Sequence, residues 1–168
     1  IALGSDAPIG IGIAHGWRRL EPPMIVTRSS GGVIQELDDE PALDVLLRRN
    51  GRSSAEGMAI GLSRRNGEDL RVIEYGDEVE RTVTSAADVP QGALCWLMDG
   101  DPAALIASAT EACAEAIAGL NGKTPLGVLA FDCGGRQLKL GPDGVQDEMA
   151  AMRAALGSTP YAGFYTSA

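Results

Sequence analysis

Short apolar runs separated by glycine-containing turns fill most of the sequence between residues 24 and 98. The runs lie at residues 24–27, 33–37, 56–63, 69–75, 79–84 and 93–98. Gly31-Gly32, Asn66-Gly67 and Gly76-Asp77 have the composition of hairpin turns. Glycine is abundant, with 22 residues, about twice the usual share. We therefore predict short strands joined by tight turns, with an antiparallel meander over residues 56–84.

The rest of the chain alternates predicted strands with predicted helices. Apolar runs predict strands at residues 8–17, 126–131 and 161–166. Gly100-Asp101-Pro102 is typical of a helix start. The helix that follows has an apolar face at helical spacing, formed by Leu105, Ala109, Ala112, Cys113, Ala116 and Leu120. Glu111 and Glu115 lie off that face.

Two further helices complete the prediction. Asp38, Asp39 and Glu40 stand before Pro41, and acidic residues stabilise the positive end of a helix that runs to about Arg49. Asn50-Gly51 is expected to end this helix. A last helix is expected at residues 145–156, after Gly141-Pro142. The fold class is α+β, a mostly antiparallel mixed sheet with helices packed on it and a strand–helix–strand unit near the C-terminus.

The charge balance excludes several classes of function. Lys and Arg number 14 and Asp and Glu number 23, which gives a net charge of −9 and a pI of about 4.5. This disfavours nucleic acids and anionic membrane surfaces as partners. No apolar stretch approaches the roughly 18 residues of a membrane span, so we expect no membrane insertion. The 3 cysteines and 1 histidine form no metal-ligand pair, no cofactor-binding pattern is present, and a reduced, cytoplasmic compartment fits best.

The segment from Cys133 to Arg136 is the strongest candidate for chemistry. Gly134 and Gly135 allow backbone amides to converge on an anion, and the Arg136 guanidinium suits a carboxylate or phosphate. Arg136 could also lower the pKa of the Cys133 thiol and make it a nucleophile, with His15, the single histidine, as its base. A tight turn with a buried cysteine and a structural ion pair is the alternative.

Two later segments can contribute to the same site. Glu148, on the last helix, could pair with Arg136 or point into a pocket above Cys133. Tyr161, Phe164 and Tyr165 gather aromatic side chains on the final strand, with Phe164 on the opposite face from the two tyrosines.

These segments resemble the FIST sensory domain. The resemblance rests on residues 126–136 (LGVLAFDCGGR), Leu140-Gly141, Glu148 and residues 160–166 (PYAGFYT). Upstream, residues 12–17, Val26-Thr27, residues 36–38 and 40–42, and Gly100-Asp101-Pro102 fit the same scheme. The family pattern is Phe-x-Cys-x-x-Arg, a helix with Glu, and a Gly-Phe-Tyr strand followed by Gly-Glu. The chain stops at Ser167-Ala168, before that last Glu, and lacks most of the N-terminal half, so we expect a piece of a longer protein.

The resemblance implies a two-part organisation and a non-catalytic function. Residues 1–50 would be the end of the FIST N-terminal domain, and residues 51–168 a C-terminal domain truncated at its end. A cytoplasmic module would bind an amino-acid-like molecule or a small carboxylate and act on a downstream signalling domain or protein. The ligand-binding positions would be Cys133, Gly134, Gly135, Arg136, Glu148, Gly163, Phe164 and Tyr165.

Two alternatives belong to other functional classes. A protein-interaction scaffold without a ligand predicts a large exposed apolar patch and a homo-oligomer. A Cys-dependent hydrolase or transferase predicts that Cys133→Ser abolishes turnover.

Overall fold

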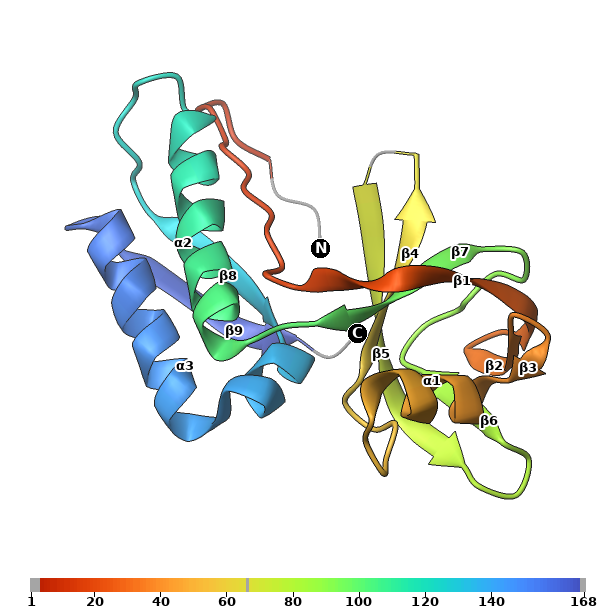
Figure 1. The fold of residues 1–168 in the computed structure, drawn as a ribbon. Helices are drawn as coiled ribbons and strands as arrows, with labels where there is room; N and C mark the ends of the chain where they lie inside the picture. Colours follow the sequence, from red (N-terminus) through yellow and green to blue (C-terminus); the bar gives the residue numbers. More distant parts are fainter. Residues whose placement is uncertain (1–3, 66, 167–168) are drawn as a thin grey trace. The chain divides into compact units, whose positions relative to one another are not determined.

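The computed structural model describes residues 4–65 and 67–166, which form two compact units (Figure 1). One unit comprises residues 18–99, and the other joins the N-terminal residues up to Trp17 with the chain from Gly100 onwards. The predicted division between residues 50 and 51 concerns the two family domains and stays a prediction.

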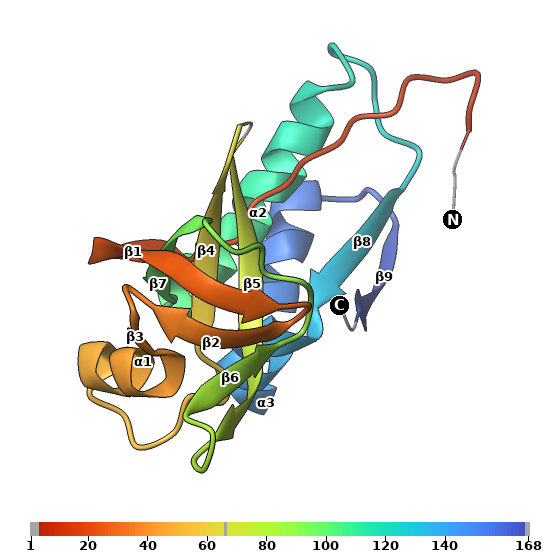
Figure 2. The same cartoon turned by 90° about the vertical axis from the view of Figure 1, so that its right-hand side faces the viewer.

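The unit of residues 18–99 is built from seven strands and one helix. The strands are β1 (Arg18–Ser30), β2 (Val33–Leu37), β3 (Glu40–Pro41), β4 (Ala59–Arg64), β5 (Gly67–Asp77), β6 (Thr82–Ser85) and β7 (Leu94–Asp99). They follow the order β1-β7-β4-β5-β6-β2-β3, and β1 also pairs with β2, all antiparallel. The sheet therefore closes into a small barrel, which leaves few unpaired edges (Figure 2).

The core of this unit is a continuous apolar cluster. Helix α1 (Ala42–Asn50) contributes Leu43, Val45 and Leu46, and the strands contribute side chains such as Ile60 and Leu62. Gly51 ends α1 in the left-handed conformation with φ +65°, as the predicted Asn50-Gly51 stop requires. β4, β5 and β6 confirm the predicted meander of residues 56–84. The turn predicted at Gly76-Asp77 was wrong, because both residues pair within β5 and the chain turns at residues 78–81. Asn66, of the other turn predicted in this meander, lies outside the described residues.

The acidic run before α1 does not cap the helix, and that prediction was wrong. Asp38 and Asp39 have φ values of +51° and +64° and form the two-residue turn between β2 and β3. Asp38 Oδ1 accepts a hydrogen bond from the Ile25 amide, and Arg49 pairs with Asp38. The helix begins after Pro41 without a side-chain cap. Asp and Asn tolerate the left-handed region of backbone conformation, so aspartates suit a tight turn as well as they suit a helix start.

The second unit contains a strand–helix–strand motif and one further helix. Its elements are α2 (Pro102–Ala118), β8 (Val128–Cys133), α3 (Gly134–Leu156) and β9 (Tyr161–Thr166). β8 and β9 run parallel, which confirms the predicted strand–helix–strand unit (Figure 2). Asp101 caps α2 by accepting a hydrogen bond from the Ala104 amide, as its sequence predicts. α3 bends at Gly141-Pro142, where Gly141 has φ +66° and Pro142 interrupts the helical hydrogen bonds.

Residues 8–15 lie along α2 without forming a strand, so the strand predicted at residues 8–17 was wrong (Figure 1). A Cβ on Gly10 would lie 1.8 Å from the Ala116 carbonyl oxygen, and one on Gly12 would lie 1.9 Å from that of Ala112. The alternating glycines let the backbone touch the helix, while Ile9, Ile11 and Ile13 point out and are 55%, 69% and 82% exposed. The alternation therefore encodes close contact with a helix.

The predicted α+β class is confirmed, with a mostly antiparallel sheet and three helices among the described residues. Within the described residues, the helices are too short or too polar to cross a membrane.

Candidate functional site

The Cys133–Arg136 segment joins β8 to α3. Cys133 precedes the helix in extended conformation, and Gly134 and Gly135 are its first residues. The alternative interpretation of this segment was wrong about a tight turn, because the helix begins directly at Gly134, but its structural ion pair is present at Arg136. A Cβ on Gly134 would lie 3.2 Å from the Thr166 carbonyl oxygen, so a glycine suits this crossing of α3 and β9.

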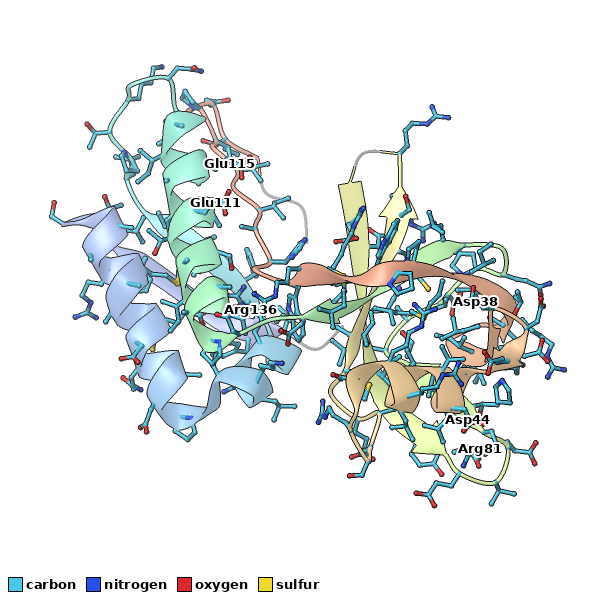
Figure 3. All side chains as sticks on the ribbon, in the orientation of Figure 1. Asp38, Asp44, Arg81, Glu111, Glu115 and Arg136 are labelled. Carbon is cyan, nitrogen blue, oxygen red and sulfur yellow. The ribbon has the colours of Figure 1, made fainter. Side chains whose placement is uncertain are left out.

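Arg136 is the centre of a buried hydrogen-bond network at the N-terminal end of α2 (Figure 3). Its side chain is 6% exposed. Nη1 donates to the His15 carbonyl oxygen at 3.1 Å and to Ser108 Oγ at 2.9 Å. Nη2 donates to the Leu105 carbonyl oxygen at 2.9 Å and to Glu148 Oε1. Four terminal N–H groups thus meet four protein acceptors.

Glu148 pairs with Arg136, the first of the two roles its sequence position offered. It is 1% exposed, and its Oε2 accepts a hydrogen bond from the Tyr165 hydroxyl at 3.0 Å. Burial raises the pKa of Glu148 above its ordinary value, Arg136 opposes the rise, and nearby Asp132 adds to it. Burial and then the bond to Glu148 raise the pKa of Tyr165 to about 12.

Asp132 and Ser108 belong to the network although sequence analysis missed them. Asp132 Oδ1 lies 3.0 Å from Arg136 Nε and accepts a hydrogen bond from the Cys133 amide at 2.7 Å. Asp132 lies on β8 and Arg136 in the first turn of α3, so the junction of strand and helix brings them together, and helical spacing could not have predicted the pair. Ser108 is a small polar residue on an apolar helix face and offered no signal in the sequence either.

The other predicted residues serve the two-stranded sheet. A Cβ on Gly163 would lie 2.3 Å from the Ala130 carbonyl oxygen, so glycine is required where β8 and β9 approach. Phe164 is 59% exposed and meets Phe131 edge to face at 5.2 Å. Tyr161 and Tyr165 turn to α3 instead, which confirms that Phe164 faces the other way. The structure thus brings together Arg136, Glu148 and Tyr165, places Cys133 and the two glycines beside them along the chain, and sets Phe164 apart.

The cysteines differ in accessibility. All three are free, with Cys95 and Cys113 buried and Cys133 partly exposed. Burial raises the pKa of Cys95 to about 12 and also raises that of Cys113. No hydrogen bond joins Cys133 to His15 within residues 4–65 and 67–166; His15 Nδ1 accepts one from the Trp17 amide. Over the same residues no cluster of His, Cys, Asp and Glu could hold a metal ion.

A shallow depression lies elsewhere, in the unit of residues 18–99. Leu43 and Leu47 of α1, the segment 53–56, Gly76 and Glu78 line it. The polar side chains that line it, Ser53, Ser54, Glu56 and Glu78, are exposed, so water and salt weaken their interactions with a charged ligand. The buried charges of the other unit are the better candidate site.

The chemical capacity of the Arg136 network is recognition of charge. An arginine, two carboxylates and a phenol are gathered in a region of low dielectric, where each contact to a charged group is stronger than in water. Arg136 can donate hydrogen bonds to a ligand carboxylate, and Glu148 or Asp132 can accept them from a ligand ammonium. In each case the ligand group replaces a protein group that now makes the hydrogen bond.

Comparison with known proteins assigns the family. The FIST C domain model matches residues 42–168, and the FIST N domain model matches residues 1–40. No curated protein and no solved structure gives a significant match. The FIST C match spans most of the chain and includes Arg136, Glu148 and Tyr165. The chain therefore belongs to the FIST family.

Proposed function

We propose that this chain is a cytoplasmic sensory module that binds an amino-acid-like molecule or a small carboxylate without catalysis. FIST domains are sensory domains of signal-transduction proteins. The ligand acts by shifting a conformational equilibrium, which a downstream signalling domain or protein detects. Three free cysteines are in keeping with a reduced compartment.

The observation that carries this proposal is the convergence of Arg136, Glu148 and Tyr165. Residues from two places on α3 and from β9 meet at hydrogen-bond distance around one buried ion pair. A buried ion pair contributes little net stability, because desolvation offsets the attraction. Its charges are instead suited to exchange partners with a ligand that carries both a carboxylate and an ammonium.

The test is thermal unfolding of the protein with glycine, other amino acids and acetate. A ligand at a hundred times its Kd adds about 2.7 kcal/mol to the free energy of unfolding, a shift of a few degrees in Tm. Glu148→Gln keeps the shape of the site and should reduce the shift. Arg48→Gln, which alters the exposed Arg48–Glu40 pair, should preserve it. No shift with any compound contradicts the proposal.

An interaction scaffold remains a second candidate because one observation favours it. Leu126, Leu129, Phe131 and Phe164 are 90%, 60%, 55% and 59% exposed, and the last three lie on β8 and β9. Exposed apolar patches often mark interaction surfaces. A protein that self-associates through these residues and ignores every small molecule would favour the scaffold. Turnover lost specifically in Cys133→Ser would favour the enzyme.

A further inference from the structure

The four terminal N–H groups of Arg136 face acceptors of unequal strength. Nη2 donates to Glu148 and to the Leu105 carbonyl inside α2, and Nε lies beside Asp132, so two carboxylates hold that side of the guanidinium. Nη1 meets two neutral acceptors, the His15 carbonyl at 3.1 Å and Ser108 Oγ at 2.9 Å. The attraction between opposite charges adds to the hydrogen bonds with the carboxylates, and the two neutral acceptors of Nη1 lack it. An arriving anion therefore displaces the Nη1 partners most easily.

Of these two partners, His15 is the one that can leave. Ser108 lies within α2 and is buried, whereas the His15 carbonyl belongs to residues 8–15, which lack regular secondary structure. The Ile13 amide donates to Glu115 Oε2 at 2.9 Å, and Gly10 and Gly12 touch α2 by their backbones. Ile9, Ile11 and Ile13 are already exposed, so lifting the segment costs no burial of these side chains.

The end of this segment has the features of a hinge. Gly16 has φ +70°, a conformation that glycine adopts at little cost. Trp17 next to it is 9% exposed, packs against Gly100 and lies under Lys139 at 5.1 Å. Residues 8–15 can thus rotate about Gly16 while Trp17 stays in place.

We propose that residues 8–15 form a strap that competes with an anionic ligand group for Nη1 of Arg136, so that ligand binding releases the strap from α2. This inference rests on the proposed function, and release of the strap is the conformational change that a downstream partner would detect. When the strap leaves α2, its own backbone groups, among them the Ile13 amide and the His15 carbonyl, become available to a downstream partner. Coupling of this kind is reciprocal. If anion binding favours release of the strap by a given factor, release of the strap strengthens anion binding by the same factor, so a variant with a loosened strap must bind the anion more tightly.

The experiment compares variants of the full chain that loosen the strap without touching Arg136. Gly12→Ala places a methyl group against the Ala112 carbonyl, whereas Gly4→Ala meets no atom within 4 Å and is the matched control. Should Gly12→Ala fail to fold, Glu115→Ala removes the acceptor of the Ile13 amide, with Glu111→Ala one turn away as its control (Figure 3). The rate of amide hydrogen exchange at Ile13 and Trp17 measures how often the strap leaves α2. Titration with acetate and glycine measures the affinity of the Arg136 site.

We expect amide exchange at Ile13 to rise about tenfold in the loosened variants, the equivalent of one hydrogen bond, with a matching gain in affinity for acetate or glycine. The same probes should accelerate that exchange in the unmodified protein. Probe binding that leaves exchange at Ile13 unchanged, or affinity equal in the loosened and control variants, overturns the strap while the proposed function stands. Failure of every variant to bind either probe overturns both.

Discussion

The two units differ in the kinds of side chain that they bury. Residues 18–99 close a barrel around an apolar cluster that includes Val26, Leu37, Leu46 and Ile60, each fully buried. In the other unit the buried residues include Arg136, Glu148 and Ser108, while Leu129, Phe131 and Phe164 are exposed. Because this unit also buries apolar side chains such as Leu105 and Leu140, its interior combines apolar packing with a buried network of charges.

This difference separates a scaffold from a responsive part. An apolar interior is indifferent to pH and small solutes, because its contacts carry no charge. A buried network of charges depends on protonation and on competing ions. Under the proposed function, the unit that contains α2, β8, α3 and β9 is therefore the one in which a ligand would change the conformational equilibrium.

The largest expected effect comes from breaking the buried ion pair on one side. Arg136→Met leaves Glu148 buried beside Asp132 without a countercharge, which should cost about 3–5 kcal/mol of unfolding free energy. Urea unfolding measures the loss. The chain has 2 tryptophans, one in each unit, so a Trp96→Phe background lets Trp17 fluorescence report this unit.

A double variant sharpens that result. Arg136→Met with Glu148→Leu removes both charges and should recover much of the loss, because well-packed apolar pairs replace buried ion pairs at little cost. Arg48→Met, in the exposed pair with Glu40, should cost at most about 1 kcal/mol. A double variant as unstable as Arg136→Met would show that the cost is not one of unpaired charge.

The next effect tests the apolar interior. Leu46→Ala should destabilise the barrel by about 2–5 kcal/mol, through lost burial and the cavity left behind. In a Trp17→Phe background the fluorescence of Trp96 follows this unit. The unfolding free energy lost through Leu46→Ala should be the same from pH 5 to pH 8, and a strong dependence on pH would break the contrast between the units.

A smaller effect is the pH dependence that Glu148 contributes. Burial raises its pKa in the folded protein, so the folded state binds more protons than the unfolded state between the ordinary and the raised value. Stability is therefore lost as the pH rises from the ordinary value near 4.5 through the raised one. Glu148→Gln should flatten this part of the stability curve, measured by urea unfolding at a series of pH values. An unchanged slope contradicts the assignment to Glu148.

The smallest effect on stability is expected on the exposed face of β8 and β9. Phe164→Ser removes the edge-to-face contact with Phe131 and should cost about 0.5–1.5 kcal/mol. Light scattering at increasing concentration shows whether it also reduces self-association. A loss of unfolding free energy as large as that caused by Leu46→Ala would mean that Phe164 packs in a hydrophobic core.

Local patterns predicted the elements whose signals lie close together in sequence. Asp101 before Pro102 capped α2, Gly51 ended α1, and residues 161–166 formed β9 as expected. Patterns that are compatible with two different local structures gave wrong predictions. Asp38 and Asp39 suit a helix start and a tight turn equally, and the glycine–isoleucine alternation at residues 8–13 suits a strand and a close contact with a helix.

By itself, the sequence determined the α+β class, the meander and a list of side chains able to bind charge, because these follow from hydrophobic periodicity and residue chemistry. The tertiary structure decided how those side chains are used. Arg136 meets His15, Ser108 and Glu148 across separations of 121, 28 and 12 residues, and β1 pairs with β7 to help close the barrel. Such contacts depend on how distant elements pack, and no local pattern of residues encodes which acceptor a guanidinium will find.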